Sequence, residues 1–153
     1  MERLFSAIDH TTNALRTQDP PSAPTACKAG CAYCCSVQVQ VLAPEILHLL
    51  DYLRRTRTKS QLTELEGQVA TLDDRIHGLS SPERAKLNVP CALLVDGNCS
   101  VYEARPIICR SGNSSDARRC QAAFGPNATS SSVETYVHQV AVCRQVLKAL
   151  ATG

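Results

Sequence analysis

The sequence predicts a mainly α fold, a small helical domain with a short β-hairpin and with long loops that carry most of its cysteines. Apolar residues recur three and four positions apart in four segments, which is the spacing of one helix face. A glycine-centred turn, Asp96-Gly97-Asn98, separates two short apolar runs and predicts the hairpin. The chain has 153 residues, so we expect a single domain over residues 1–153.

The first two helices are expected over residues 3–17 and from Pro44 to about Arg55. Proline is favoured at the first position of a helix because the N–H that it lacks would have no partner there. The proline-rich segment 19–24 ends the first helix. Residues 1–24 are therefore a helix and a linker, and they precede the cysteine-rich core of the chain, about 27–120.

A third helix is expected over residues 60–79, with Ser60 as its cap. Its apolar residues form one narrow stripe, composed of Leu62, Leu65, Val69, Leu72, Ile76 and Leu79. Such a stripe predicts packing against one neighbouring helix. A short fourth helix is expected to begin at Ser81-Pro82-Glu83.

The segment after these helices changes character. Residues 90–102 predict the hairpin, and Pro106 precedes a short turn that carries Cys109. Residues 111–131 are rich in Ser, Asn, Gly and Ala, and they predict a loop that contains Cys120.

A last helix is expected over about 132–150, with Ser131 and Glu134 as a capping box. Cys143 lies on its apolar stripe with Val140 and Leu147. We therefore interpret Cys143 as a core residue.

Composition limits the classes of function. Aromatic residues make up 4% of the chain and Trp is absent, which argues against a base-stacking platform or a large aromatic pocket. A formal net charge of +2 is too small to predict nucleic-acid binding. Residues 1–20 hold no apolar core of signal-peptide length, and no window approaches a membrane span. We therefore expect a cytoplasmic protein with no nucleic-acid or membrane partner.

Nine cysteines in 153 residues are the unusual feature of the composition. Disulfides do not persist in the cytosol, so closely spaced thiols there indicate a metal or cluster site. Eight of them fall in two groups, namely Cys27, Cys31, Cys34 and Cys35, and then Cys91, Cys99, Cys109 and Cys120. Zinc and iron–sulfur clusters are both held by thiolates, and four ligands complete a closed site. Buried core cysteines and a disulfide framework are the disfavoured alternatives, because these thiols cluster among Pro, Gly and polar residues.

Eight thiols allow two four-cysteine sites, one site with spare thiols, or a binuclear site. Cys34 and Cys35 are adjacent, and neighbouring side chains diverge on either a helix or a strand. We expect these two cysteines either to bind two nearby metals, or to have different roles, one binding a metal while the other packs in the protein.

Both groups lie in motifs that resemble the YkgJ-type cysteine-cluster family. The motifs are Cys27-x3-Cys31-x2-Cys34-Cys35 followed by Glu45, and Pro90-Cys91, a short turn, Cys99-x-x-Tyr102 and Arg105-Pro-x-x-Cys109-Arg110. Together they span about 27–110. The resemblance implies a zinc- or iron-chelating domain that binds zinc or an iron–sulfur cluster through its cysteines. It implies no reaction for the stand-alone domain, although a similar cluster occurs in flagellin lysine-N-methylases.

Several side chains are expected around the ligands. Arg105 and Arg110 flank the cysteines, where guanidinium groups donate hydrogen bonds to sulfur and offset thiolate charge, although pairing with Glu103 or a carbonyl is the ordinary alternative. Tyr102 is expected to cover the cluster or to pack in the core. Glu45 is either a neighbour of the site or a first-turn carboxylate that the helix dipole favours.

Three functions remain open from these residues. The first is a metal-binding domain whose ion is structural and whose surface serves a protein partner. The second is an iron–sulfur enzyme or redox protein related to the cysteine-cluster part of the lysine N-methylases. The third is a metal store or carrier. The metal itself, zinc or an iron–sulfur cluster, is not decided by the residues.

Overall fold

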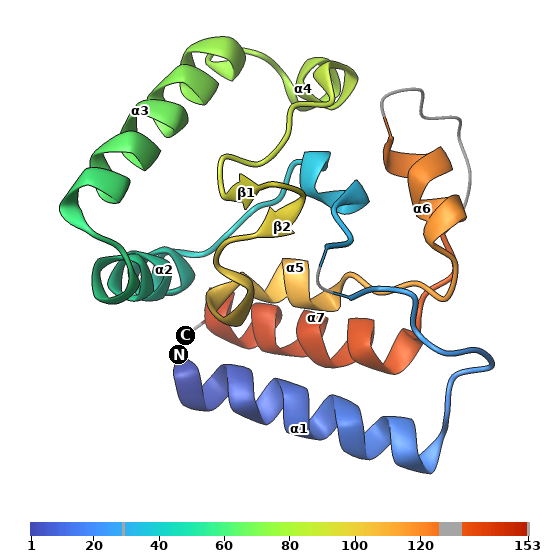
Figure 1. Ribbon diagram of the computed structural model, residues 1–153. Coiled ribbons are helices and arrows are strands. Elements are labelled where there is room, and N and C mark those ends of the chain that lie inside the picture. Colours follow the sequence, from blue (N-terminus) through green and yellow to red (C-terminus); the bar gives the residue numbers. More distant parts are fainter. Residues whose placement is uncertain (29, 126–132, 153) are drawn as a thin grey trace.

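The computed structural model describes residues 1–28, 30–125 and 133–152 (Figure 1). It is mainly α with one two-stranded antiparallel hairpin, so the predicted fold class is confirmed. In chain order the elements are α1 (Glu2–Gln18), the 3₁₀-helix η1 (Tyr33–Ser36), α2 (Ala43–Thr56), α3 (Lys59–Ile76), α4 (Ser81–Leu87), β1 (Leu94–Val95), β2 (Asn98–Cys99), the 3₁₀-helix η2 (Tyr102–Ala104), α5 (Ile107–Ser111), α6 (Ala117–Phe124) and α7 (Val137–Thr152).

The apolar core lies where α7 packs against α1 and α5. Figure 1 shows α1 and α7 side by side and antiparallel, with the two ends of the chain close together. Phe5 and Ile8 of α1 meet Ile107 of α5 and Cys143 of α7, and all four are at most 4% exposed. The interpretation of Cys143 as a core residue is therefore confirmed.

A buried arginine joins the same three elements. The guanidinium of Arg110 lies 4.3 Å from the centre of the Phe5 ring, and its Nη1 is 2.9 Å from Oδ2 of Asp9. It also donates hydrogen bonds to the carbonyls of Glu103 and Arg105. Because the side chain is 5% exposed, these partners replace water around the charge.

Helix α3 leaves the core, and its apolar stripe packs less closely than predicted, since every residue of the stripe except Val69 is half-buried. None of its residues is buried, and Val69 in the middle of the apolar stripe is 48% exposed. Its cap is Thr58 rather than Ser60. The Thr58 hydroxyl accepts a hydrogen bond from the Gln61 backbone N–H, and the Gln61 side-chain oxygen accepts one from the Thr58 backbone N–H, which completes a capping box. Figure 1 shows α3 at the edge of the molecule.

The segment predicted as a loop over 111–131 contains a helix, α6. Asp116 caps it, because its Oδ1 accepts a hydrogen bond of 2.8 Å from the Arg118 backbone N–H. The Ala, Arg and Gln residues that follow are good helix formers, a signal that the Ser, Asn and Gly content of the segment concealed. The final helix begins at Val137, later than the predicted start near 132. Ser131 of the predicted capping box lies outside the described residues.

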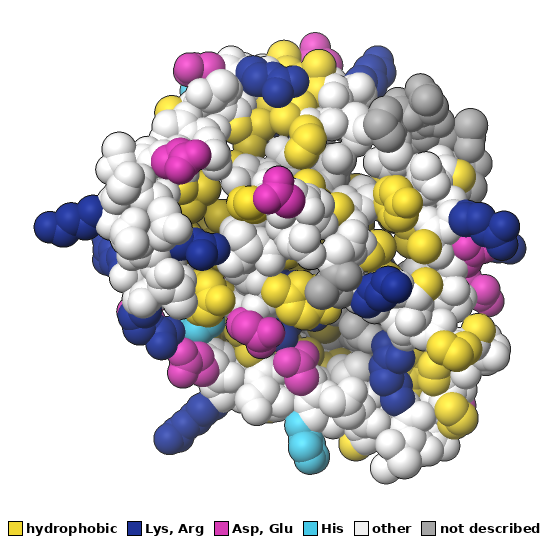
Figure 2. All heavy atoms as spheres, in the orientation of Figure 1, with side chains coloured by type: hydrophobic (Ala, Val, Ile, Leu, Met, Phe, Trp, Pro, Cys, Tyr) yellow, Lys and Arg dark blue, Asp and Glu magenta, His cyan; other side chains and the backbone are white. Residues whose placement is uncertain are grey.

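The surface carries charges of both signs. On the face shown in Figure 2, Lys and Arg side chains alternate with Asp and Glu side chains. Over the described part of the chain, no helix combines the length and apolar content that crossing a membrane requires.

The core predicts how stability responds to truncation. Ile107→Ala should lower the free energy of unfolding by about 2–5 kcal/mol, because the side chain is fully buried between α5, α1 and α7. Leu47→Ala on α2 is the control, since that leucine is 68% exposed. Equilibrium urea unfolding measures both. Equal losses for the two variants would place the core elsewhere.

Candidate metal centre

The first cysteine group lies on a turn and η1 rather than on one face of an α-helix. The Cys31 backbone N–H donates to the Lys28 carbonyl at 3.0 Å, and that of Cys35 donates to the Ala32 carbonyl at 2.9 Å. Gly30, between Lys28 and Cys31, has φ +86°, a left-handed conformation that residues other than glycine rarely adopt. This turn folds the segment back so that Cys34 and Cys35 stand on η1.

The hairpin brings the second group to η1. The Cys91 backbone N–H donates a hydrogen bond of 2.9 Å to the Cys35 carbonyl. Leu94, whose N–H bonds back to the Cys91 carbonyl at 3.0 Å, pairs with Cys99 across the two strands. Cys109 follows on α5. Cysteines more than fifty positions apart in the sequence are thus held beside one another by backbone hydrogen bonds.

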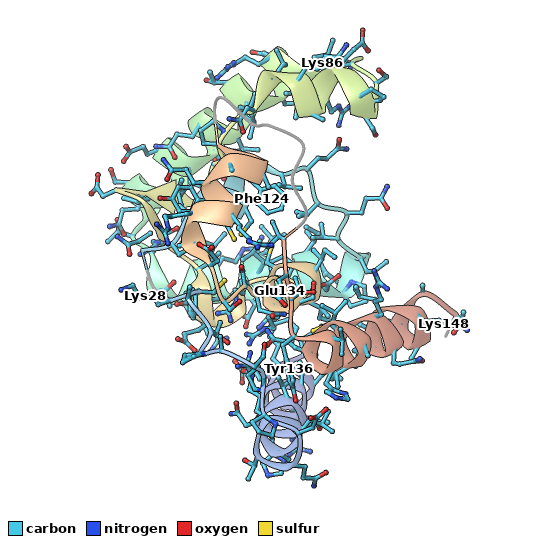
Figure 3. All side chains as sticks on the ribbon, turned by 90° about the vertical axis from the view of Figure 1, so that its right-hand side faces the viewer. Lys28, Lys86, Phe124, Glu134, Tyr136 and Lys148 are labelled. Atoms are coloured by element: carbon cyan, nitrogen blue, oxygen red, sulfur yellow. The ribbon has the colours of Figure 1, made fainter. Side chains whose placement is uncertain are left out.

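Cys120 reaches the same region from α6. This helix packs against η1, and Cys120 is its buried residue. The Ala26 backbone N–H donates a hydrogen bond of 2.7 Å to the Ser114 carbonyl, which ties the segment before Cys27 to the one that enters α6. In Figure 3, which faces α6 with Phe124 labelled at its end, yellow sulfur atoms are visible beside this helix.

The thiols influence one another electrostatically. Burial raises the pKa of the Cys109 thiol to about 12, and nearby negative charge on Cys91, Cys34 and Cys99 adds to the shift. Burial also raises the pKa of Cys27, where the charges of Cys31, Cys120 and Cys34 act in the same direction. In both cases repulsion from the other thiolates adds to the effect of burial and disfavours the ionised form.

Cys34 and Cys35, which are adjacent on η1, influence each other's ionisation. A hydrogen bond from the Cys35 thiol lowers the pKa of Cys34, and the same bond raises the pKa of Cys35. Cys34 is also exposed, so this pair lies at the surface of the cysteine region.

The cysteine region has the donor chemistry of a metal centre. Within residues 1–28, 30–125 and 133–152, no three Cys, His, Asp or Glu side chains are already close enough to hold one ion. Thiolates are the preferred ligands of zinc and of iron–sulfur clusters.

The two flanking arginines have different surroundings. The guanidinium of Arg105 stacks 3.6 Å from the centre of the Tyr102 ring and donates to the Tyr102 carbonyl. Its positive charge lowers the pKa values of Cys34 and Cys109, although larger effects oppose it at Cys109. The guanidinium of Arg110 instead bonds to Asp9 and to the carbonyls of Glu103 and Arg105. The tyrosine ring itself is 41% exposed.

Glu45 holds α5 in place. Its carboxylate is 1% exposed and accepts hydrogen bonds from the backbone N–H groups of Leu42, at 2.9 Å, and Ile107, at 2.8 Å. The first bond is the first-turn capping role that the sequence offered as one alternative. The second was missed, because no local pattern shows that Glu45 reaches an N–H sixty-two positions away. Through it, the carboxylate positions the short helix that carries Cys109.

This fold and the cysteines around η1 define a class of protein, the small, mainly helical cysteine-cluster domain. A comparison with protein families matches residues 26–144 to the family CxxCxxCC, described as "Putative zinc- or iron-chelating domain". The match covers most of the chain, so the protein belongs to this family, and the resemblance to a cysteine-cluster family is confirmed. No curated protein and no solved structure gives a significant match.

Truncating Glu45 tests its role as an anchor. Glu45→Ala should lower the free energy of unfolding by about 1–3 kcal/mol for each backbone N–H that loses its acceptor inside the protein. Glu45→Gln should fall between wild type and Glu45→Ala, because one amide oxygen can satisfy only one of the two donors.

Glu83→Ala is the matched control for this prediction. Glu83 accepts from the Ser80 backbone N–H in the first turn of α4, but that hydrogen bond is exposed to solvent. Urea unfolding compares the variants. A loss for Glu45→Ala no larger than that for Glu83→Ala would contradict the anchoring role.

Proposed function

We propose that this protein binds zinc or an iron–sulfur cluster through Cys27, Cys31, Cys34, Cys35, Cys91, Cys99, Cys109 and Cys120, and that the bound metal organises the loops around η1. The observation that carries the proposal is the convergence on η1 of cysteines from three separate parts of the chain. Membership of a family described as zinc- or iron-chelating supports the same reading.

The burial pattern supports a structural role for the metal. Among the described residues, none from 13 to 44 and none from 54 to 100 is buried. The cysteine-bearing segments therefore bury little apolar surface of their own, and burial of such surface is the main stabilising contribution in most domains. Thiolate–metal bonds would link these segments instead, as in small domains that fold only when the metal is bound.

Arg105 is the flanking residue that best fits a position next to the ligands. Its charge acts on Cys34 and Cys109, one from each sequence group, and would offset the excess negative charge of a thiolate-bound metal. Tyr102 would hold Arg105 there by stacking. Arg110 contributes indirectly, because its pairing with Asp9 fixes α5 against α1.

An iron–sulfur redox role is the second candidate, and it has one observation in its favour. Cys34 and Cys91 are exposed, so a cluster held by them would have an edge at the surface. Electron transfer and metal exchange both need such an edge. A structural ion does not, so the nature of the bound metal separates the two roles.

Elemental analysis of protein purified without oxygen and without added metal tests the proposal. We expect either zinc without colour, or iron with matching acid-labile sulfide and a brown colour. Cys99→Ser should lower the metal content, whereas Cys143→Ala should leave it unchanged, because Cys143 packs in the apolar core. Wild-type protein that carries neither metal and takes up neither zinc nor iron would overturn the proposal.

Metal removal should affect one part of the molecule more than the other. Stripping the metal with a chelator should lower the unfolding midpoint and expose the amides of residues 30–36 and 88–100 to rapid hydrogen exchange. The amides of α1 and α7 should keep much of their protection, because their core contains Cys143 but none of the proposed ligands. Metal-free protein that melts as high as the loaded form, with unchanged exchange, would contradict the structural role.

A further inference from the structure

We infer that the cysteines form two neighbouring four-thiolate centres whose membership crosses the two sequence groups: Cys27, Cys31, Cys34 and Cys120 in one, and Cys35, Cys91, Cys99 and Cys109 in the other. This inference rests on the proposed function and assigns its ligands. Consecutive residues, Cys34 and Cys35, belong to different centres, so the two metals are neighbours in space.

The centre that contains Cys35 is built on the hairpin. The backbone hydrogen bond from Cys91 to the Cys35 carbonyl brings η1 to the start of the hairpin. Cys99 pairs with Leu94 across the two strands, so their side chains lie on the same face of the hairpin. The charges of Cys91 and Cys99 act on both Cys35 and Cys109. We therefore assign these four thiols to one centre between η1, the hairpin and α5.

The centre that contains Cys120 is built on α6. The hydrogen bond from Ala26 to the Ser114 carbonyl holds the Cys27 segment against the entry to α6, and α6 packs on η1. A hydrogen bond with the Ser114 backbone lowers the pKa of the Cys27 thiol, although the larger effect of burial raises it. The cysteines whose charges act on Cys27 are Cys31, Cys120 and Cys34, and none of them belongs to the hairpin.

Cys34 stands at the boundary between the centres. Its charge acts on Cys27 of one centre and on Cys109 of the other, and it is hydrogen-bonded to Cys35. We place Cys35 rather than Cys34 with the hairpin because the Cys91 backbone N–H donates to the Cys35 carbonyl and the charges of Cys91 and Cys99 act on Cys35. Cys34 then completes the centre of Cys27, and each centre has the four thiols that a closed tetrahedral site takes. Eight thiols then satisfy two ions with none left over.

Cobalt(II) titration of paired variants tests this grouping, because thiolate-bound cobalt absorbs light and reports each filled centre. Wild-type protein should take up about two cobalt ions per chain. Cys31→Ser combined with Cys120→Ser removes ligands from one centre only and should leave about one ion. Cys31→Ser combined with Cys35→Ser damages both centres and should abolish tight, all-thiolate binding.

The sequence grouping predicts the opposite result. Under that grouping one ion is bound by Cys27, Cys31, Cys34 and Cys35 together. Substituting Cys31 and Cys35 would then remove one bound ion, and substituting Cys31 and Cys120 would remove both. That reversal, or a single ion in wild-type protein, would overturn the inference while leaving thiolate metal binding intact. A wild-type protein that binds no cobalt, zinc or iron would overturn the proposed function itself. Cys143→Ala is the control and should bind as wild type does.

A second measurement needs no variant. Wild-type protein given one equivalent of cobalt is treated briefly with a thiol-alkylating reagent, and the protected cysteines are identified by peptide mass. Protection should appear in one of the two proposed sets, with Cys35 and Cys120 never protected by the same ion. Joint protection of Cys91, Cys99, Cys109 and Cys120, with Cys35 alkylated, would overturn the grouping.

Discussion

The position of α5 depends on two buried charged groups, and the rest of the molecule depends on α5. The carboxylate of Glu45 accepts the first N–H of this helix, and the guanidinium of Arg110 fixes its other end against Phe5 and Asp9. A helix of five residues has little stability of its own, so these contacts replace the backbone hydrogen bonds that a longer helix would have. The same helix supplies Ile107 to the core and Cys109 to the cysteine region.

The molecule therefore has two parts with different sources of stability. Helices α1, α5 and α7 bury apolar side chains against one another. Around η1 and the hairpin the described residues bury almost nothing, and the segments are joined by a few backbone hydrogen bonds. The stability of a domain of this kind increases most when distant segments are linked, and thiolates around a bound metal would provide such links.

Membership of a chelating family and the arrangement of the thiols address different questions. The family match establishes which class of domain this is. The arrangement bears on how a metal would be held, since α6, which carries Cys120, packs on η1, which carries Cys34 and Cys35. A cysteine of the second sequence group thus comes near the first group, although 88 other residues separate Cys31 from Cys120 in the chain.

Local patterns in the sequence were enough to predict the mainly α class, the hairpin, the core position of Cys143 and the chelating family, because helix periodicity, turn residues and motif spacing are properties of short segments. Other features were beyond them. No local pattern shows how deeply the apolar stripe of α3 is buried, links Arg110 to Asp9, or shows that Glu45 reaches Ile107. These are contacts between segments far apart in the chain, and they depend on how the helices pack in three dimensions.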